Sequence, residues 1–411
     1  YLGGSKSQVY QLFCDLKEVS WDQIRGKNWH KLQQESATNT YLGLLSYDDF
    51  ANHLKSTVGI RGVFHPDWQK SLQKSDKSVF KTSKLYQSAS SLIWSQGQFK
   101  LIGNPSQQTK QLVRQIDQKP TNHLTNQTKF QLVEVTSKAD YLRQIKSVLS
   151  DIKNGRYYQL NLLRRFVLPQ LSSYQELRSN KELWLSLMAY LWHYSENMSV
   201  LLCVKGQMVV SFSPERFVRT TYQQDGAKLF LESFPIKGTA PRGHNTQEDQ
   251  RLKRELNQSF KDQRELNMII DLMRNDMASV SWPGSVKVQD PGSVHSFASV
   301  FHRQGHIISQ LCQNVTLESL LCNLLPIGSI TGTPKKEVVT AISEYEQCSR
   351  GYFMGSVFLL DRRGFDSSVL IRTLVLNEDG PAEYAAGSGL ICDSDALKEY
   401  AEIKAKCAMW Y

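Results

Sequence analysis

The segment SFPIKGTAPRG, residues 233–243, follows the apolar run Leu229–Leu231 and contains two prolines and two glycines. An apolar run followed by such a segment predicts a β-strand that ends in a loop. Loops at strand ends commonly hold reacting groups. Lys237 lies between Pro235, whose ring restricts the backbone, and Gly238, which lets other atoms approach closely. A solvent-exposed loop lysine is the simplest interpretation, and the residues downstream decide whether a functional one is better.

Hairpin patterns surround this segment. The runs Val200–Val204 and Met208–Phe212 flank Lys205-Gly206-Gln207, which predicts a β-hairpin. Helical apolar spacing alternates with further expected strands. We expect helices at 137–154, 176–193, 246–260, 262–273 and from Ser394 onward. We expect strands at 157–162, 355–360, 368–376 and 383–386. Because hairpins dominate, we expect an α+β fold on mainly antiparallel sheets rather than βαβ winding.

Length and composition narrow the class of protein. A chain of 411 residues is longer than one core usually holds, so length alone predicts two or three domains. With 40% hydrophobic and 21% charged residues, the composition is that of an ordinary soluble globular protein. The net charge of +10 is scattered along the chain, which favours attraction of small anions over a nucleic-acid partner.

The cysteines and the apolar runs indicate the compartment. Seven cysteines, an odd number, include no Cys-x-x-Cys pair, so buried thiols in a reducing, cytoplasmic setting are expected. No apolar run is long enough for a membrane span, and we expect no membrane association. Residues 1–130 are polar and carry no chemical motif, apart from a strand expected at 41–47 and a linker at 119–127.

Two pairs of acidic residues suggest a metal site. Asp262 and Glu265 are three positions apart on one expected helix, and Glu399 and Glu402 have the same spacing on the last helix. This spacing places both carboxylates of a pair on one helix face, and Mg²⁺ prefers such oxygen ligands. The competing interpretation is two solvated faces with an ion pair between Glu402 and Lys406, and spacing alone favours it.

The segment Gly328–Lys335 also has two interpretations of similar weight. Thr333 suits a helix N-cap and Pro334 a first helical position. A glycine-containing loop at a helix start offers backbone N–H groups to an anion, but a capped helix after a glycine turn explains the pattern equally well. The segment is not a Walker loop, and the chain contains no Gly-x-Gly-x-x-Gly motif.

Two further sets of charged residues are candidates for a functional or structural role. Arg372 lies within an expected strand at 369–376, where a guanidinium needs a partner, either a ligand carboxylate or a structural ion pair. The cluster Asp271–Asp276 ends a helix and is interpreted as a structural salt-bridge corner.

From about Ser137 to Lys406 the chain resembles the chorismate-utilising enzymes, which include component I of anthranilate synthase and of aminodeoxychorismate synthase, and the isochorismate and salicylate synthases. The matching blocks are 158–162, 213–217, 235–243, 265–276, 328–335, 371–373, 386–389 and 399–406. The resemblance implies one large α/β sandwich with two central, mainly antiparallel sheets and helices outside. Residues 1–130 match loosely and are expected to pack into the same body, beside a chorismate-binding catalytic region at 131–411.

Two positions select a branch of the family. Lys237 in the block Pro235–Thr239 looks like the aminodeoxychorismate synthase signature, whereas anthranilate synthases typically have Ala there. Gln159 lies where isochorismate and salicylate synthases place a water-activating lysine, which argues against hydroxyl transfer. The implied reaction replaces the C4 hydroxyl of chorismate by an amino group. Lys237 would attack the ring at C2 as the hydroxyl leaves, and ammonia would then displace it.

The resemblance also implies roles for other residues. Glu215 matches the residue assigned to proton transfer at the leaving hydroxyl, and Ser285 another polar active-site position. Glu265 and Glu402 match Mg²⁺ ligands that hold the ring carboxylate, with Asp262 and Glu399 in support. The pyruvyl carboxylate and the rest of the substrate are expected at the positions Arg372, Thr331, Gly332, Gly387, Gly389 and Thr239.

The chain departs from the family pattern at one histidine. The family often carries a His where this chain has Ser296, and His295 stands one residue earlier. The chain shows no glutaminase signature, so ammonia from glutamine would require a separate amidotransferase subunit. The alternatives are anthranilate synthase component I and a chorismate-binding subunit without catalysis; a nucleic-acid binder is the most remote.

Overall fold

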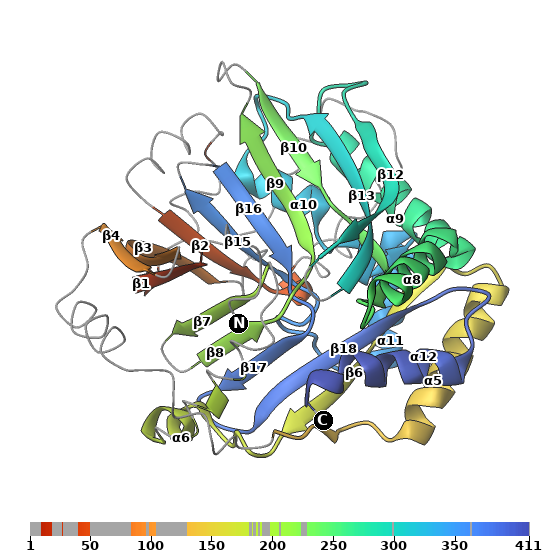
Figure 1. Ribbon diagram of the computed structural model, residues 1–411, viewed down its shortest axis with the longest axis horizontal. Coiled ribbons are helices and arrows are strands. Elements are labelled where there is room, and N and C mark those ends of the chain that lie inside the picture. The colour runs from red at the N-terminus through yellow and green to blue at the C-terminus, as the bar shows by residue number, and fades with distance from the viewer. Residues whose placement is uncertain are drawn as a thin grey trace.

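The computed structural model describes residues 10–18, 27, 40–49, 84–95, 98–103, 130–180, 183, 186–187, 190, 198–204, 207–222, 228–297, 300–361 and 364–410. Two antiparallel sheets form the centre, and helices lie outside them (Figure 1). This arrangement confirms the predicted α+β sandwich. The expected linker at 119–127 lies outside the described residues.

The larger sheet contains eleven strands of the described chain, in the order β1-β3-β2-β15-β16-β9-β10-β13-β11, with β4 paired to β3 and β12 to β13. Their bounds are Tyr10–Glu18 (β1), Thr40–Leu45 (β2), Lys84–Ser95 (β3), Gln98–Gly103 (β4), Arg216–Tyr222 (β9), Leu229–Ser233 (β10), Ile236–Pro241 (β11), Lys287–Ser296 (β12), Val300–Gln310 (β13), Ser356–Asp361 (β15) and Gly364–Val369 (β16). Leu42 of β2 pairs with Leu359 of β15, so segments from both ends of the chain share this sheet.

The smaller sheet has seven described strands in the order β14-β6-β18-β17-β8-β7, with β5 paired to β6. The strands are Val133–Glu134 (β5), Gln159–Leu168 (β6), Val200–Val204 (β7), Gln207–Ser211 (β8), Gly332–Thr333 (β14), Thr373–Asn377 (β17) and Ala382–Leu390 (β18). The expected hairpin appears as β7–β8, in which Cys203 pairs with Met208. Nearly every residue of β6 is buried, as expected for a central strand covered on both faces.

Helices cover the sheets and contribute to the region between them. They are Lys138–Lys153 (α5), Tyr174–Ser179 (α6), Thr246–Gln258 (α8), Phe260–Ala278 (α9), Leu317–Leu324 (α10), Lys335–Glu346 (α11) and Ala396–Lys406 (α12), with short 3₁₀ turns at Gly328–Ile330 (η2) and Ala408–Trp410 (η3). Helices α8 and α9 pack on β11 and β13, whereas α12 packs on β18 and α5 (Figure 1). Among the helices of the described residues, none is both long and apolar enough to cross a membrane.

Helix α5 follows the sequence pattern closely. Its N-cap is Ser137, whose hydroxyl accepts the backbone N–H of Asp140. Tyr141, Ile145, Val148 and Ile152 form the buried face, and Gly155 with a φ of 78° ends the helical segment. The predicted helix at 137–154 is therefore confirmed.

Other boundaries differ from expectation. Pro334, rather than Thr333, is the N-cap of α11, because Thr333 pairs with Gln159 in the sheet. Asp395 rather than Ser394 caps α12, its carboxylate accepting from Leu397 and Lys398 N–H. The strand expected at 368–376 is divided into β16 and β17, because the backbone at Arg372 has a φ of 49°, in the left-handed region.

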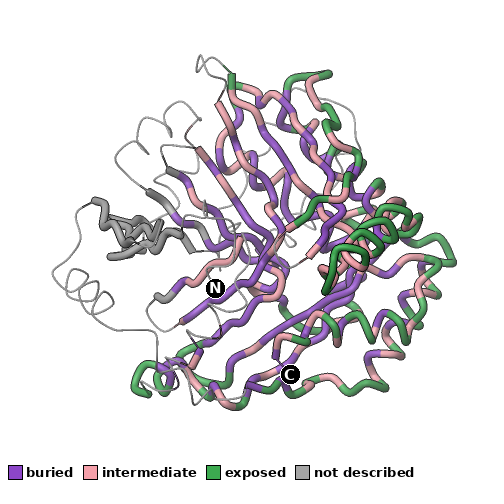
Figure 2. The backbone as a smooth tube through the Cα atoms, in the orientation of Figure 1, coloured by how far each residue is buried: buried purple, intermediate pink, exposed green. Residues whose placement is uncertain are grey.

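The apolar core is continuous between the sheets and the helices, as the buried segments in Figure 2 show. Trp410 is fully buried near the C-terminal end of the described chain. Its ring stacks on Tyr190 with centroids 4.9 Å apart and meets Phe130, Phe212 and Tyr384 edge-on. Aromatic side chains bury large apolar areas, so this cluster fixes the segment that follows α12 against the smaller sheet.

Candidate active site

A cavity of about 600 Å³ lies where the two sheets meet α9 and α12. This volume suits a small-molecule ligand. The structure brings most of the expected site residues to its wall, namely Glu215, Lys237, Thr239, Asp262, Glu265, Arg372, Gly387, Gly389, Glu399 and Glu402. Residues separated by nearly two hundred positions therefore converge on one site.

Three expected residues lie elsewhere. The hydroxyl of Ser285 donates to Trp282 O at 2.6 Å and accepts from Gln310 N at 3.2 Å, so it closes a turn at the end of β13. The N–H of Thr331 donates to Gly328 O at 3.2 Å within η2. Gly332 pairs with Leu160. The backbone groups of Thr331 and Gly332 therefore serve the local fold. The preceding residues Ser329 and Ile330 line the cavity instead.

The segment around Lys237 forms β11, with an irregularity in its pairing to β13 between Ile236 and Thr239. Gly238 lies in this irregularity with a φ of 84°. A Cβ atom at Gly238 would lie 2.9 Å from the Cβ of Asp262, near the start of α9. Glycine is therefore required here for both conformation and close approach, which explains the residue between Lys237 and Thr239.

Glu215 is one of two buried carboxylates on the cavity wall, with 7% of its surface exposed, and Glu399 on α12 is the other. Burial raises the pKa of Glu215 to about 7, although Lys237, the N–H of Ile236 and the hydroxyl of Ser329 oppose the shift. A carboxyl group with such a pKa can hold or release a proton near neutral pH. Glu215 is therefore suited to proton transfer.

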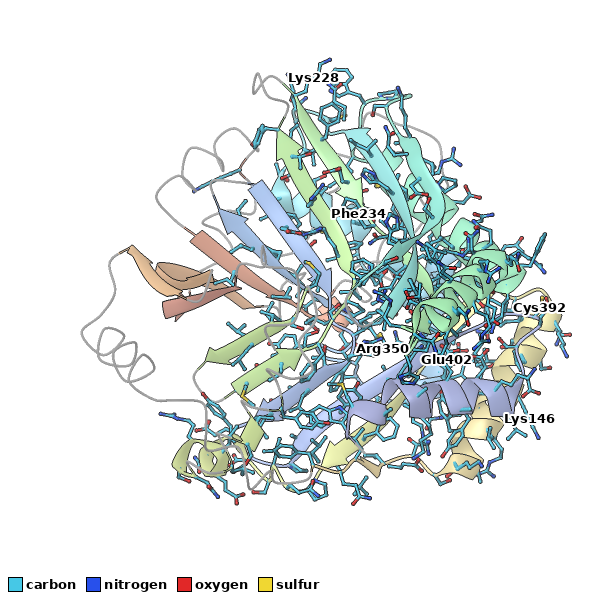
Figure 3. The ribbon with its side chains drawn as sticks, in the orientation of Figure 1. Lys146, Lys228, Phe234, Arg350, Cys392 and Glu402 are labelled. Carbon is cyan, nitrogen blue, oxygen red and sulfur yellow. The ribbon has the colours of Figure 1, made fainter. Side chains whose placement is uncertain are left out.

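The four other carboxylates come from two helices that face each other. Asp262 and Glu265 lie on α9, and Glu399 and Glu402 lie on α12, where Figure 3 labels Glu402. Burial raises the pKa of Glu265, opposed by Lys237 and Lys261 and assisted by Glu402 and Asp262. All four carboxylates line the same cavity, so the two acidic faces meet across it.

Lysine side chains balance part of this acidity. Lys406 Nζ lies 2.8 Å from Glu402 Oε1 and donates to Gly387 O at 2.7 Å. Burial alone would raise the pKa of Glu402, but Lys406, with Lys237 and Lys261, lowers it. Lys261 lies 3.7 Å from Glu265. The ion pair expected between Glu402 and Lys406 is present on the wall of the cavity, with 45% of the Glu402 side chain still exposed to solvent.

The chemistry of this donor set suits a hard cation, since all four groups are carboxylates in a partly buried cavity. Glu399 already accepts a hydrogen bond from Ser394 at 2.8 Å. With the side chains in this arrangement, the described residues include no group of three His, Cys, Asp or Glu that could hold a metal ion. A cation here would therefore require Glu402 and Glu265 to exchange their lysine partners for it.

The other charged cluster expected from the sequence is structural. Lys335 Nζ lies 2.7 Å from Asp276 Oδ2 and donates to Leu324 O, with both charged side chains largely buried. Arg274 pairs with Asp271 at 2.8 Å on the surface. The interpretation as a salt-bridge corner is thus confirmed, and the cation of Lys335 joins α9 to the start of α11.

One cavity residue, His302 on β13, was not anticipated. Its Nδ1 lies 2.8 Å from Thr239 Oγ1, and burial, together with the charge of Arg372, lowers its pKa to about 4. By contrast, His295 and Ser296 are exposed and do not line the cavity, and His295 faces Asp290 at 3.3 Å. Only the pairing of β13 with β11 reveals the position of His302.

A family model described as chorismate binding enzyme matches residues 6–410. The chain belongs to this family. The resemblance stated from the sequence blocks is thereby confirmed.

Relatives in this family carry two different activities in their names. The chain is 34% identical over 276 residues to "Probable aminodeoxychorismate synthase, chloroplastic" of Oryza sativa, covering 66% of this chain and 29% of that protein. It is 33% identical to aminodeoxychorismate synthase component 1 of Salmonella typhimurium, over 65% of this chain and 55% of the relative. Anthranilate synthase component 1 of Acetivibrio thermocellus is 30% identical over 65% of this chain and 51% of the relative. The match thus spans about half, or less, of these relatives.

Solved structures of the family share the fold. Anthranilate synthase component I from Streptococcus pneumoniae superposes with a TM-score of 0.72 at 19% identity, covering 98% of this chain and 92% of that chain. MenF, the menaquinone-specific isochorismate synthase from Escherichia coli, gives 0.62 at 16% identity, covering 98% and 94%. At these identities the likeness establishes the two-sheet architecture and not the reaction.

Proposed function

We propose that this chorismate-utilising enzyme is an aminodeoxychorismate synthase component I, which converts chorismate and ammonia to 4-amino-4-deoxychorismate for the synthesis of 4-aminobenzoate and folate. The observation that carries the proposal is the presence of Lys237 on the wall of the cavity, together with the buried Glu215. The relatives include both aminodeoxychorismate and anthranilate synthases, so the branch depends on the lysine in the block 235–239.

In the proposed reaction Lys237 Nζ forms a bond to C2 of the ring while both ring double bonds shift and the bond from C4 to its hydroxyl breaks. Glu215 gives its proton to the departing oxygen, which leaves as water. Ammonia then forms a bond to C4, both double bonds shift back, the bond from C2 to Lys237 Nζ breaks, and the surplus proton on the new amino group returns to Glu215. The pKa of about 7 at Glu215 supports the acid role, since a substantial fraction of that carboxyl is protonated at neutral pH.

The two carboxylates of the substrate would bind at two different places on the cavity wall, one at Arg372 and the other at the proposed Mg²⁺. Arg372 is proposed to bind the pyruvyl carboxylate, next to Gly387 and Gly389 of β18. A Cβ atom would lie 2.9 Å from the Met354 side chain at Gly387 and 2.9 Å from the Gln159 side chain at Gly389, so glycine lets these side chains pack closely on the strand. Glu265 and Glu402 are proposed to hold Mg²⁺, with Asp262 and Glu399 in support, and the bound ion would supply positive charge for the ring carboxylate.

A partner is also part of the proposal. The name component 1 of the bacterial relative implies a second component for that protein. For this chain we propose a separate glutamine amidotransferase that supplies ammonia, while free ammonium replaces it in the test below.

The test is identification of the product formed from chorismate, Mg²⁺ and ammonium, with and without an added aminodeoxychorismate lyase. We expect 4-aminobenzoate only when the lyase is present. Formation of anthranilate without the lyase would instead identify an anthranilate synthase component I. Chorismate binding without turnover under all these conditions would indicate a non-catalytic subunit.

A further inference from the structure

We propose that His302 is a further substrate-binding residue, which donates a hydrogen bond from Nε2 to the same chorismate carboxylate that Arg372 binds. The inference rests on the proposed function, because it takes chorismate as the ligand. It extends that function by adding a neutral, directional donor to a subsite otherwise assigned to a guanidinium.

The ring of His302 is held in one orientation by its neighbours. Thr239, its cross-strand partner on β11, lies with Oγ1 2.8 Å from Nδ1. The ring of Phe297 packs against it edge-on, with centroids 5.4 Å apart. A hydrogen bond at one imidazole nitrogen selects the tautomer and orients the other nitrogen. When the Thr239 hydroxyl donates to Nδ1, Nε2 carries the proton.

Nε2 is the nitrogen available for a ligand. No hydrogen bond to it is formed by the residues that the structure describes, and His302 lines the cavity. His306, four positions further along β13, provides a contrast. Its Nε2 lies 3.0 Å from Glu232 Oε1, its ring stacks on Phe234, and it does not line the cavity. Of these two histidines on one strand, only His302 is placed to meet a substrate.

The charge of the subsite favours this role. Burial and the positive charge of Arg372 keep the imidazole of His302 neutral at pH 7, since its pKa is lowered to about 4. A neutral N–H donor does not repel the guanidinium of Arg372, which lines the same cavity. A carboxylate between them accepts from both, and hydrogen bonds to charged groups are stronger than those between neutral ones. The pair is therefore complementary to a single carboxylate.

The experiment measures chorismate binding by calorimetry in a Lys237→Ala background, where the proposed covalent step is removed. His302→Phe keeps the ring but removes both nitrogens, and we expect its Kd to rise roughly tenfold or more. His302→Gln, which retains an amide donor, should fall between the parent and His302→Phe. His306→Gln serves as the matched control on the same strand, with an expected change below about twofold. An unchanged Kd for His302→Phe and His302→Gln overturns the proposal.

Nitrogen NMR of the histidine side chains gives a second readout that a purely structural histidine would not produce. In the free parent we expect the neutral Nε2–H tautomer, and addition of chorismate should shift the Nε2–H resonance of His302 but not that of His306. Absence of a shift at His302 upon saturation contradicts the proposal. Release of anthranilate by the parent would overturn the proposed reaction, while the Kd of the His302 variants still decides the role of His302.

Discussion

Lys406 and Glu402 stand one helical turn apart on α12, and the ammonium of Lys406 lies 2.8 Å from Glu402 Oε1 while also donating to Gly387 O. The lysine thus connects the acidic helix to the glycine-containing strand β18 across the cavity. A cation that binds Glu402 would have to compete with the ammonium of Lys406, so metal binding is expected to displace Lys406 from this carboxylate.

Removal of a proposed ligand should therefore raise the Mg²⁺ requirement. For Glu402→Gln and Glu265→Gln we expect half-maximal activity at a Mg²⁺ concentration at least about tenfold higher, because each variant loses a hard anionic ligand. Glu344→Gln, which removes only a surface ion pair with Arg156, is the control. Saturation of both site variants at the same Mg²⁺ concentration as the parent would exclude the metal role.

Lys237 decides between the two aminating branches. Lys237→Ala should lose C4 amination by several powers of ten, each about 1.4 kcal/mol of barrier, because the proposed nucleophile is absent. Mass spectrometry of the parent with chorismate and Mg²⁺, but without ammonium, should detect a chorismate-derived adduct on the peptide containing Lys237. Full activity of Lys237→Ala with the same product would refute the covalent route.

Arg372→Lys tests the carboxylate subsite. Lysine preserves the charge but cannot form the two parallel hydrogen bonds of a guanidinium. We expect the KM for chorismate to rise about tenfold or more, with a smaller change in kcat. A KM equal to that of the parent would show that Arg372 is a structural residue.

The raised pKa of Glu215 predicts that both activity and stability depend on pH. Activity should fall as the pH rises above about 7, since the proposed acid loses its proton there. Its folded-state pKa is raised above the ordinary 4.5, so its contribution to stability is present below pH 4.5 and is lost as the pH rises through 7. Relative to a group with the ordinary pKa, ionised Glu215 lowers the free energy of unfolding at pH 8 by an amount on the order of 3 kcal/mol.

Glu215→Gln removes that ionisation. We therefore expect the unfolding temperature of the variant, relative to the parent, to be higher at pH 8 than at pH 5, while its activity is strongly reduced. If the difference in unfolding temperature is the same at both pH values, the pKa of Glu215 is not raised in the folded protein.

Gly238→Ala isolates the contact between β11 and α9. Gly238 and Gly155 both have positive φ, of 84° and 78°, but a Cβ atom meets Asp262 at 2.9 Å only at Gly238 and has nothing within 4 Å at Gly155. Gly155→Ala should cost about 1 kcal/mol from backbone strain alone. Gly238→Ala should cost clearly more in urea unfolding and should reduce activity. Equal costs would mean that α9 moves freely away from the strand.

Much of the fold follows from local sequence patterns. The hairpin β7–β8 and the helix α5 are marked by alternation, a turn and a cap, which are properties of neighbouring residues. The break between β16 and β17 is not marked, because the apolar run around Arg372 continues through it, and only the surrounding structure imposes its φ of 49°. The same limit applies to Thr333, whose pairing with Gln159 is a long-range contact.

Site residues could be predicted from the sequence where both their chemical type and their order along the chain match those of a known family. Lys237, Glu215 and the four helix carboxylates were identified through blocks of residues that resemble a known family. His302 was missed because its location depends on strand pairing, and neighbouring Phe301 and Arg303 are buried too, so alternation does not reveal which face it occupies. Thr331 and Ser285 were misplaced because their hydrogen bonds serve turns that sequence alone does not define.

The pairing of β2 with β15 has a consequence for how the protein is made. Ser46, just after β2, donates its hydroxyl to Gly351 O, a partner 305 positions later in the chain. At roughly 5 to 20 residues per second, the ribosome needs about 15 to 60 seconds to synthesise the intervening chain. During that interval one edge of β2 has no strand beside it and is open to wrong partners. β2 can therefore complete its place in the larger sheet only after β15 has been synthesised.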